Sequence, residues 1–154
     1  MNSSDRSAAP ELRSLLWEGL KSGTLAALAM VPFGLAFRAA GLRVGYYGPK
    51  FAALYLPDPT PPLLFAQHIV LGWISALPLV LLIARVALPF GPVAAGALYG
   101  VLYYVAVNSL ALPLTFGDPT PWQLGLDVIV PSLVVHLVFG TTIGYVSRHI
   151  ARAR

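Results

Sequence analysis

Two histidines and one asparagine are the polar side chains best placed for chemistry in an otherwise apolar chain. His68, Asn108 and His136 each lie within a long hydrophobic stretch, and Asp127 lies at the start of the last one. Imidazole can carry a proton or ligate a metal, and a carboxamide can hydrogen-bond a ligand. Ionisable groups inside a membrane are costly and often functional. These four residues are therefore the candidates for ligand binding or proton handling.

A glycine follows each of these histidines by one helical turn, which also permits a structural interpretation. In His68-x-x-x-Gly72 and His136-x-x-x-Gly140, the small residue lets a neighbouring backbone approach and brings the imidazole into the helix bundle. Each ring would then bond to Asn108, a tyrosine or a carbonyl and hold helices in register. Proton handling or ligand binding is the second interpretation. Metal or axial haem ligation by the two histidines is the third, and the sequence leaves all three open.

Catalytic signatures do not accompany these residues in the sequence. It contains no Gly-x-Ser-x-Gly, no phosphate-binding loop, no His-Glu-x-x-His and no paired carboxylates within a hydrophobic stretch. The lack of cysteine excludes thiol catalysis and iron–sulfur clusters. We therefore expect a membrane protein without catalytic machinery, namely an accessory subunit or a scaffold that binds lipid or partner helices. A small carrier or channel, or a bis-histidine haem-binding bundle, is the alternative.

The composition is that of a protein embedded in the lipid bilayer. Of 154 residues, 57% are hydrophobic and 10% are charged, whereas soluble domains carry about 25% charged residues. A membrane-spanning helix needs roughly 20 mostly apolar residues. Four such stretches fit the chain and leave no room for a large soluble domain. We predict one all-α domain of four transmembrane helices, with spans at residues 15–40, 61–86, 92–114 and 124–147.

Residues 41–60, between the first two predicted spans, are expected to lie along the membrane surface. This segment combines glycines, prolines and two cations with several tyrosines and a phenylalanine. Glycine and proline interrupt a spanning helix, and amphipathic aromatic side chains favour headgroup depth. We expect an interfacial loop with room for one short helix after Pro49.

The last span has a distinctive beginning. Thr120 and Pro121 match an N-cap followed by proline at the first helical position, and Gln123 can complete a capping box. Farther along, Pro131 lacks an N–H, and its ring conflicts with the carbonyl of Asp127. We therefore expect an interfacial lead-in, a kink at Pro131 and a membrane-crossing part after the kink.

A short repeat suggests that the chain consists of two related helix pairs. Asp-Pro-Thr-Pro occurs at residues 58–61 and 118–121, before each His-x-x-x-Gly stretch. Both pairs would begin and end on the same side of the membrane, as in a parallel repeat. A chance match in a proline-rich chain is the alternative. The glycines that we expect to mediate close helix packing are Gly72, Gly96, Gly100, Gly140 and Gly144.

The basic residues predict the orientation of the chain. If both termini are cytoplasmic, seven lysines and arginines fall on the inner side and three on the other. Such an excess is typical of the cytoplasmic side. Because these cations lie at the ends of apolar spans, we expect contacts with lipid headgroups and no nucleic-acid partner. Other membrane subunits or further copies of the chain are possible partners.

One stretch of the first span carries a resemblance to a known family. The run Gly-Leu-Lys-Ser-Gly-Thr-Leu-Ala-Ala-Leu-Ala-Met at residues 19–30 resembles the glycine- and alanine-rich first helix of the YagU-like small bacterial inner-membrane proteins. The helices that carry His68 and His136 are similar to that family as well. The resemblance implies a four-helix, multi-pass protein of the cell inner membrane, and it assigns no active residue.

The predicted orientation has a direct test. A reporter fused after Asp118 is expected on the outer side of the membrane, because the cations concentrate on the side that holds both termini. Paired fusions to alkaline phosphatase and to a fluorescent protein at this position should give phosphatase activity without fluorescence. Fluorescence without phosphatase activity would place Asp118 in the cytoplasm and contradict the orientation.

Overall fold

Four helices long and apolar enough to cross a membrane make up the computed structural model, which describes residues 12–44 and 47–152. No strand occurs within these ranges. The prediction of an all-α protein with four spanning helices is confirmed. The spans are α1 (Leu12–Ala39), α3 (Pro61–Arg85), the run Gly91–Phe116, and α7 (Leu126–Val146).

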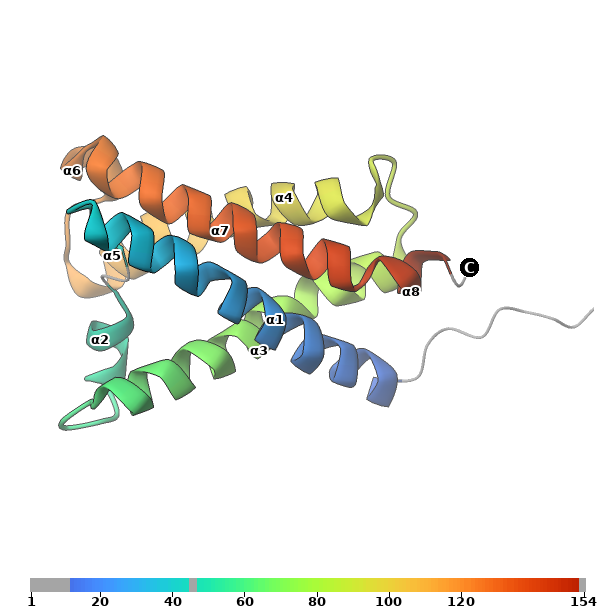
Figure 1. Cartoon of the computed structure of the whole chain (residues 1–154), viewed down its shortest axis with the longest axis horizontal. Coiled ribbons are helices and arrows are strands. Elements are labelled where there is room, and N and C mark those ends of the chain that lie inside the picture. Colours follow the sequence, from blue (N-terminus) through green and yellow to red (C-terminus); the bar gives the residue numbers. More distant parts are fainter. Residues whose placement is uncertain (1–11, 45–46, 153–154) are drawn as a thin grey trace, which may run out of the picture.

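Three short helices connect or follow the spans. α2 (Tyr47–Ala52) lies in the segment that the sequence assigns to the membrane surface, and α6 (Pro121–Leu124) precedes the last span. α8 (Arg148–Arg152) follows it. Figure 1 shows that α8 lies at the end of the bundle where α1 begins, and that α2, α5 (Leu112–Phe116) and α6 lie at the other. We call these the terminal end and the α2 end.

The third span is not a uniform α-helix. It consists of α4 (Gly91–Tyr103), the π-helix η1 (Tyr104–Ala111) and α5 (Leu112–Phe116). Pro113 supplies a physical reason, because its ring would meet the carbonyl four residues back in an α-helix. The wider register before it is seen in the bond from the Leu112 N–H to the Val107 carbonyl, five residues back. Sequence reasoning missed this π-helix, a form that often occurs at functional sites.

The last span begins as predicted but is interrupted at a different residue. The capping box is present, with the Thr120 N–H donating to Gln123 Oε1 at 2.8 Å. The interruption lies at Gly125, whose φ of 109° and ψ of 179° end α6. Glycine alone adopts this conformation without strain. Pro131, where the sequence predicted a kink, lies inside the continuous helix α7.

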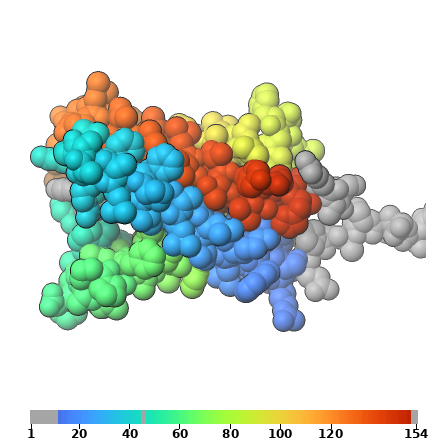
Figure 2. All heavy atoms as spheres, viewed as in Figure 1, coloured from blue at the N-terminus to red at the C-terminus, as the bar shows by residue number. Residues whose placement is uncertain are grey.

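The helices pack as two pairs joined through α1 and α7. α1 packs against α3, α4 packs against α7, and α1 also contacts α7. Figure 1 shows α3 crossing α1 and diverging from α7 toward the α2 end. In the space-filling view of Figure 2, α1 in blue lies between α3 in green and α7 in orange and red. α3 therefore has few contacts with the α4–α7 pair at the α2 end.

Glycines bring the backbones of α4 and α7 into direct contact. A Cβ atom added to Gly140 would lie 2.0 Å from the carbonyl oxygen of Gly96, and one added to Gly100 would lie 2.2 Å from that of His136. A Cβ on Gly144 would lie 2.2 Å from the Pro92 carbonyl oxygen. No side chain fits at such distances, so only glycine permits this approach.

The other helix pair has the same kind of contact. A Cβ atom on Gly23 of α1 would lie 2.6 Å from the carbonyl oxygen of Gly72 on α3. In both pairs, the glycine that follows the histidine by one turn therefore lies against a glycine of the preceding span. At the terminal end the four spans enclose a core of fully buried side chains, among them Leu15, Leu79, Ile83 and Ile143.

The α4–α7 contact predicts a large effect from one methyl group. Gly140→Ala should destabilise the protein, because overpacking costs about 1–3 kcal/mol and exceeds the roughly 1 kcal/mol that alanine gains in helix propensity. Reversible unfolding in mixed micelles, followed by circular dichroism, measures the change. Gly48→Ala is the control, since a Cβ there has no atom within 4 Å. Equal stability of both variants would contradict the packing.

Candidate functional site

A cavity of about 440 Å³ lies between the two helix pairs at the α2 end. Its walls are mostly apolar and come from α1, α2, α3, the third span, α6 and α7. On α3 the lining runs from Leu64 to Ser75, which corresponds to roughly 16 Å of helix. A bilayer has a hydrocarbon core of about 30 Å. The cavity therefore extends from the α2 end to about the middle of the membrane.

Three of the four polar candidates from the sequence meet in this cavity. His68 from α3, Asn108 from η1 and His136 from α7 all line it, although they are distant in sequence. Gln67, Ser132 and Arg43 also contribute to the lining. Arg43 follows α1 and is exposed, which places the cation at the mouth.

His68 is held by the backbone of the neighbouring helix. Its Nε2 atom lies 3.1 Å from the carbonyl oxygen of Ala27 on α1. A carbonyl can only accept, so Nε2 carries the proton in this bond. The contact depends on the close approach of Gly23 and Gly72, one turn away on each helix. The hydrogen bond from Nε2 thus links α3 to α1, and Nδ1 remains available for another partner.

The backbone of its own helix and two tyrosine rings hold His136. Its Nδ1 atom lies 2.6 Å from the carbonyl oxygen of Ser132, so Nδ1 donates and Nε2 remains. The Tyr103 ring stacks on the imidazole at a centroid distance of 5.7 Å and an interplanar angle of 24°, and the Tyr104 ring lies at 5.8 Å. These contacts fix the plane of the ring.

Asn108 has no hydrogen-bond partner among the residues that the structure describes. Its position on the π-helix turns the carboxamide into the cavity lining. Two neighbours on η1, Tyr104 and Ser109, are buried and have hydroxyl groups without a partner within the described ranges. Unsatisfied polar groups inside a membrane are costly. Of these three residues only Asn108 belongs to the cavity lining, where its carboxamide can hydrogen-bond a polar group of a ligand.

Tyrosines connect α3 to α4 beside the cavity. Tyr99 donates its hydroxyl proton to the carbonyl oxygen of Ser75 at 2.5 Å. The hydroxyl groups of Ser75 and Tyr103 lie 2.8 Å apart. The tyrosine that stacks on His136 is thus itself fixed by α3. The sequence predicted that each histidine bonds to Asn108, a tyrosine or a carbonyl. The structure shows carbonyl partners for both rings, and Tyr103 contacts His136 through its ring.

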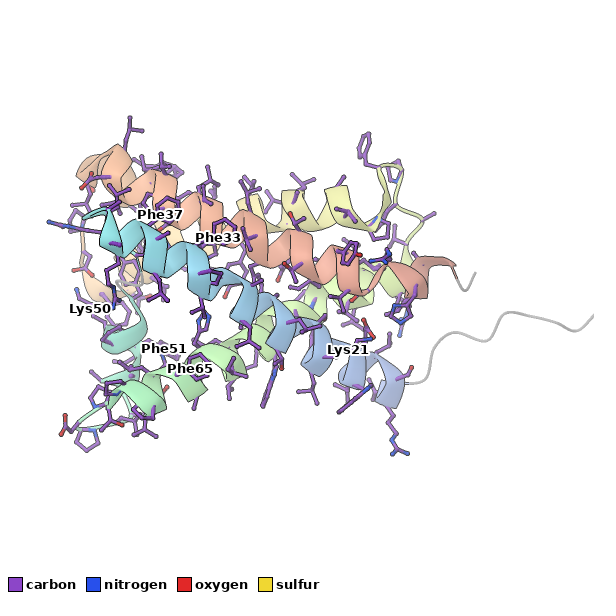
Figure 3. All side chains as sticks on the ribbon, in the orientation of Figure 1. Lys21, Phe33, Phe37, Lys50, Phe51 and Phe65 are labelled. Atoms are coloured by element: carbon purple, nitrogen blue, oxygen red, sulfur yellow. The ribbon has the colours of Figure 1, made fainter. Side chains whose placement is uncertain are left out.

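Polar contacts hold α2 and the residues that follow it across the outer part of the cavity. Gln67 donates through Nε2 to the Gly48 carbonyl oxygen at 3.0 Å and accepts a hydrogen bond from the Tyr55 hydroxyl. Lys50 forms an ion pair with Asp118, with Nζ–O distances of 2.5 and 2.6 Å. Figure 3 shows Lys50 on α2, at the end of the bundle opposite that of Lys21. One of the two repeated aspartates thus fastens α2.

Asp127, the fourth candidate from the sequence, lies outside the cavity. Its side chain is exposed in the first turn of α7 and is not part of the lining. Nine residues separate it from His136, which is roughly two and a half helical turns. The two side chains therefore point to opposite faces of α7. A carboxylate at this position instead complements the positive end of the helix dipole.

The third histidine belongs to a separate cluster at the terminal end. Glu18 of α1 is only 4% exposed, and its carboxylate contacts Lys21 Nζ at 2.6 Å and His149 Nε2 at 3.6 Å. Ser147 donates its hydroxyl proton to this carboxylate at 3.0 Å. The cluster fastens α1 to the end of α7 and to α8. The sequence pattern did not indicate this burial, because it depends on contacts with the distant Ser147–His149 segment.

Comparison with known proteins adds no further information. No protein-family model, no curated protein and no solved structure matches the chain. The described residues also contain no group of three or more histidine, cysteine, aspartate or glutamate side chains able to hold a metal ion. The fold and the cavity thus define a multi-pass helical membrane protein with an internal cavity, and its interpretation depends on the residues themselves.

Because the cavity lies on one side of the third span, we expect that face to contact water and the opposite face to contact lipid. The natural chain has no cysteine, so a single introduced thiol can be labelled without background. Asn108→Cys should react with a water-soluble maleimide, because the reactive thiolate forms only in contact with water. Leu110→Cys is the control, since Leu110 lies on the same π-helix and faces outward with 45% exposure. Similar labelling rates in native membranes would contradict a hydrated cavity.

Proposed function

We propose that this protein binds an amphipathic, membrane-soluble ligand within the bilayer and acts as a scaffold or accessory subunit without catalytic activity. The observation that carries the proposal is the cavity of about 440 Å³ between the two helix pairs. Ligand pockets commonly measure 300–1,000 Å³ and combine apolar walls with a few convergent polar groups. His68, Asn108 and His136 supply such groups among apolar side chains.

The closed terminal end favours retention of a ligand. Below the cavity, Leu79, Ile83 and Ile143 form a fully buried core. Beyond that core, Glu18 links α1 to the Ser147–His149 segment. A ligand that enters at the α2 end therefore meets tightly packed side chains halfway across the membrane. This geometry suits a binding protein better than an open channel.

A small carrier is the second candidate, and one observation favours it. The cavity lies between two helix pairs, each of which has a histidine one turn before its glycine contact. Transporters built from repeats place their substrate site near the membrane midplane, between the repeats. The Asp-Pro-Thr-Pro repeat supports a duplicated origin for the two pairs. A carrier would have to open the terminal end by separating α1 from α7.

The membrane and the orientation form part of the proposal. We place the chain in the bacterial inner membrane with both termini in the cytoplasm, so that the cavity opens outward. The positions of the cations support this orientation. The α1 start and α8 lie at the same end of the bundle, which agrees with an even number of spans (Figure 1). Membership of the YagU-like proteins would agree with this arrangement.

Haem is the alternative occupant that we consider for the same cavity. Both His68 and His136 line it, and each has one ring nitrogen that is not used in its carbonyl contact. Two imidazoles suffice as axial ligands of haem iron. The visible absorption spectrum of the purified protein tests whether haem is bound, because haem iron ligated by two histidines gives a Soret band.

A cavity-filling substitution tests ligand binding. Leu71→Trp should displace the ligand, because Leu71 lines the cavity and an indole would occupy much of its volume. Leu81→Trp is the matched control on the same helix, since Leu81 is 39% exposed on the outer surface of α3. The measurement is mass spectrometry of small molecules extracted from each purified protein, together with its absorption spectrum.

We expect at least a tenfold loss of a co-purified amphiphile from the Leu71→Trp variant and no loss from the control. A Soret band in the wild type that disappears in Leu71→Trp would identify the occupant as haem. If the wild type retains no small molecule, or if both tryptophan variants retain it equally, the proposed function is wrong.

A further inference from the structure

We infer that the cavity selects a ligand whose buried polar group is a hydroxyl, which makes the ligand a membrane-soluble alcohol or phenol. This inference rests on the proposed ligand binding and concerns the chemical class of the ligand. It derives from the hydrogen bonds that His68 and His136 already make within the protein. These bonds determine what the two rings can offer to a molecule in the cavity.

Both imidazoles use their N–H group inside the protein. His68 donates through Nε2 to the Ala27 carbonyl, and His136 donates through Nδ1 to the Ser132 carbonyl. Each neutral ring then has one nitrogen left, and that nitrogen can only accept a hydrogen bond. Neither remaining nitrogen has a partner within the described part of the chain. The cavity thus presents two unsatisfied acceptors.

The cavity lining supplies no charged partner for a protonated ring. The residues that line the cavity include no aspartate or glutamate, so no carboxylate there stabilises an imidazolium. The only lysine or arginine in that lining is Arg43, exposed at the mouth. An imidazolium in the middle of the membrane would have to be accommodated without a counter-ion, which is costly. Both rings therefore act as acceptors.

This pattern discriminates between polar groups of a ligand. A hydroxyl can donate to an imidazole nitrogen and can still accept from the Asn108 carboxamide, which also lines the cavity. A carboxylate or a phosphate diester only accepts, so it would face two ring nitrogens that also accept. An ether has no proton to donate. The apolar walls fit the hydrocarbon part of an alcohol or phenol.

A metal ion satisfies the site less well. Two nitrogen lone pairs could bind one, but structural zinc sites use four protein ligands and catalytic sites three. No cluster of at least three ligating side chains exists in the described ranges. A hydroxylated ligand needs only the groups that the cavity supplies.

A pair of ligands that differ only at the hydroxyl tests the inference. The probes are 4-nonylphenol and its methyl ether, titrated into the purified full-length protein and counted by native mass spectrometry. We expect the phenol to bind about tenfold more tightly, because one to two hydrogen bonds distinguish the probes. His68→Ala and His136→Ala should each reduce this preference severalfold while leaving the affinity for the ether nearly unchanged. His149→Ala is the control, because His149 lies in the terminal-end cluster.

The outcomes separate this inference from the proposed function. If both probes bind the wild type with equal affinity, the cavity binds amphiphiles but the hydroxyl preference is wrong. If neither probe binds, both the inference and the proposed cavity function are contradicted. The comparison on the wild type needs no variant, so a histidine variant that fails to fold does not affect it. Tighter binding of the phenol that persists in both cavity variants would also overturn the role of the histidines.

Discussion

The close approach of backbones at glycine is the constraint on which the rest of this structure depends. Between lipid-embedded helices no hydrophobic effect drives association, so packing and hydrogen bonds must do so. Gly96 and Gly140 bring α4 against α7, and Gly23 and Gly72 bring α1 against α3. The same contacts place the Ala27 carbonyl within reach of the His68 ring. The contacts that pack the helices therefore also orient the His68 side chain of the candidate site.

The two ends of the bundle differ because of these contacts. α1 contacts both α3 and α7, so the spans can close completely only where α1, α3 and α7 converge. At the terminal end they do, and the Glu18 carboxylate is buried there with Lys21, Ser147 and His149 as partners. A buried charge without such partners would be strongly destabilising. At the α2 end, α3 diverges and a cavity remains, spanned on its outer side by α2.

Polar groups within the membrane give the cavity its chemical character. The π-helix places Asn108 in the lining, and Tyr103 stacks on His136 while its hydroxyl lies next to that of Ser75. Each imidazole donates to a carbonyl, which leaves acceptor nitrogens in a mostly apolar space. This combination supports the binding of a membrane-soluble ligand, and it explains how histidines can serve helix packing and a binding site together. The structural and the functional interpretations of these rings are compatible.

The sequence by itself determined the class of protein and the number of spans, because lipid requires about 20 apolar residues per helix and leaves few alternatives. It also predicted the Thr120–Gln123 capping box, since capping depends on residues within one turn.

Only the tertiary structure decided which polar residues meet. Asp127 lies outside the cavity because helix phase turns it away from His136, and Glu18 is buried because α7 and α8 cover it. The π-helix and the interruption at Gly125 were not predicted either, since both depend on how strain near proline and glycine is resolved against neighbouring helices. Composition sets which segments enter the membrane, whereas the rotation of each helix about its axis depends on contacts with distant parts of the chain.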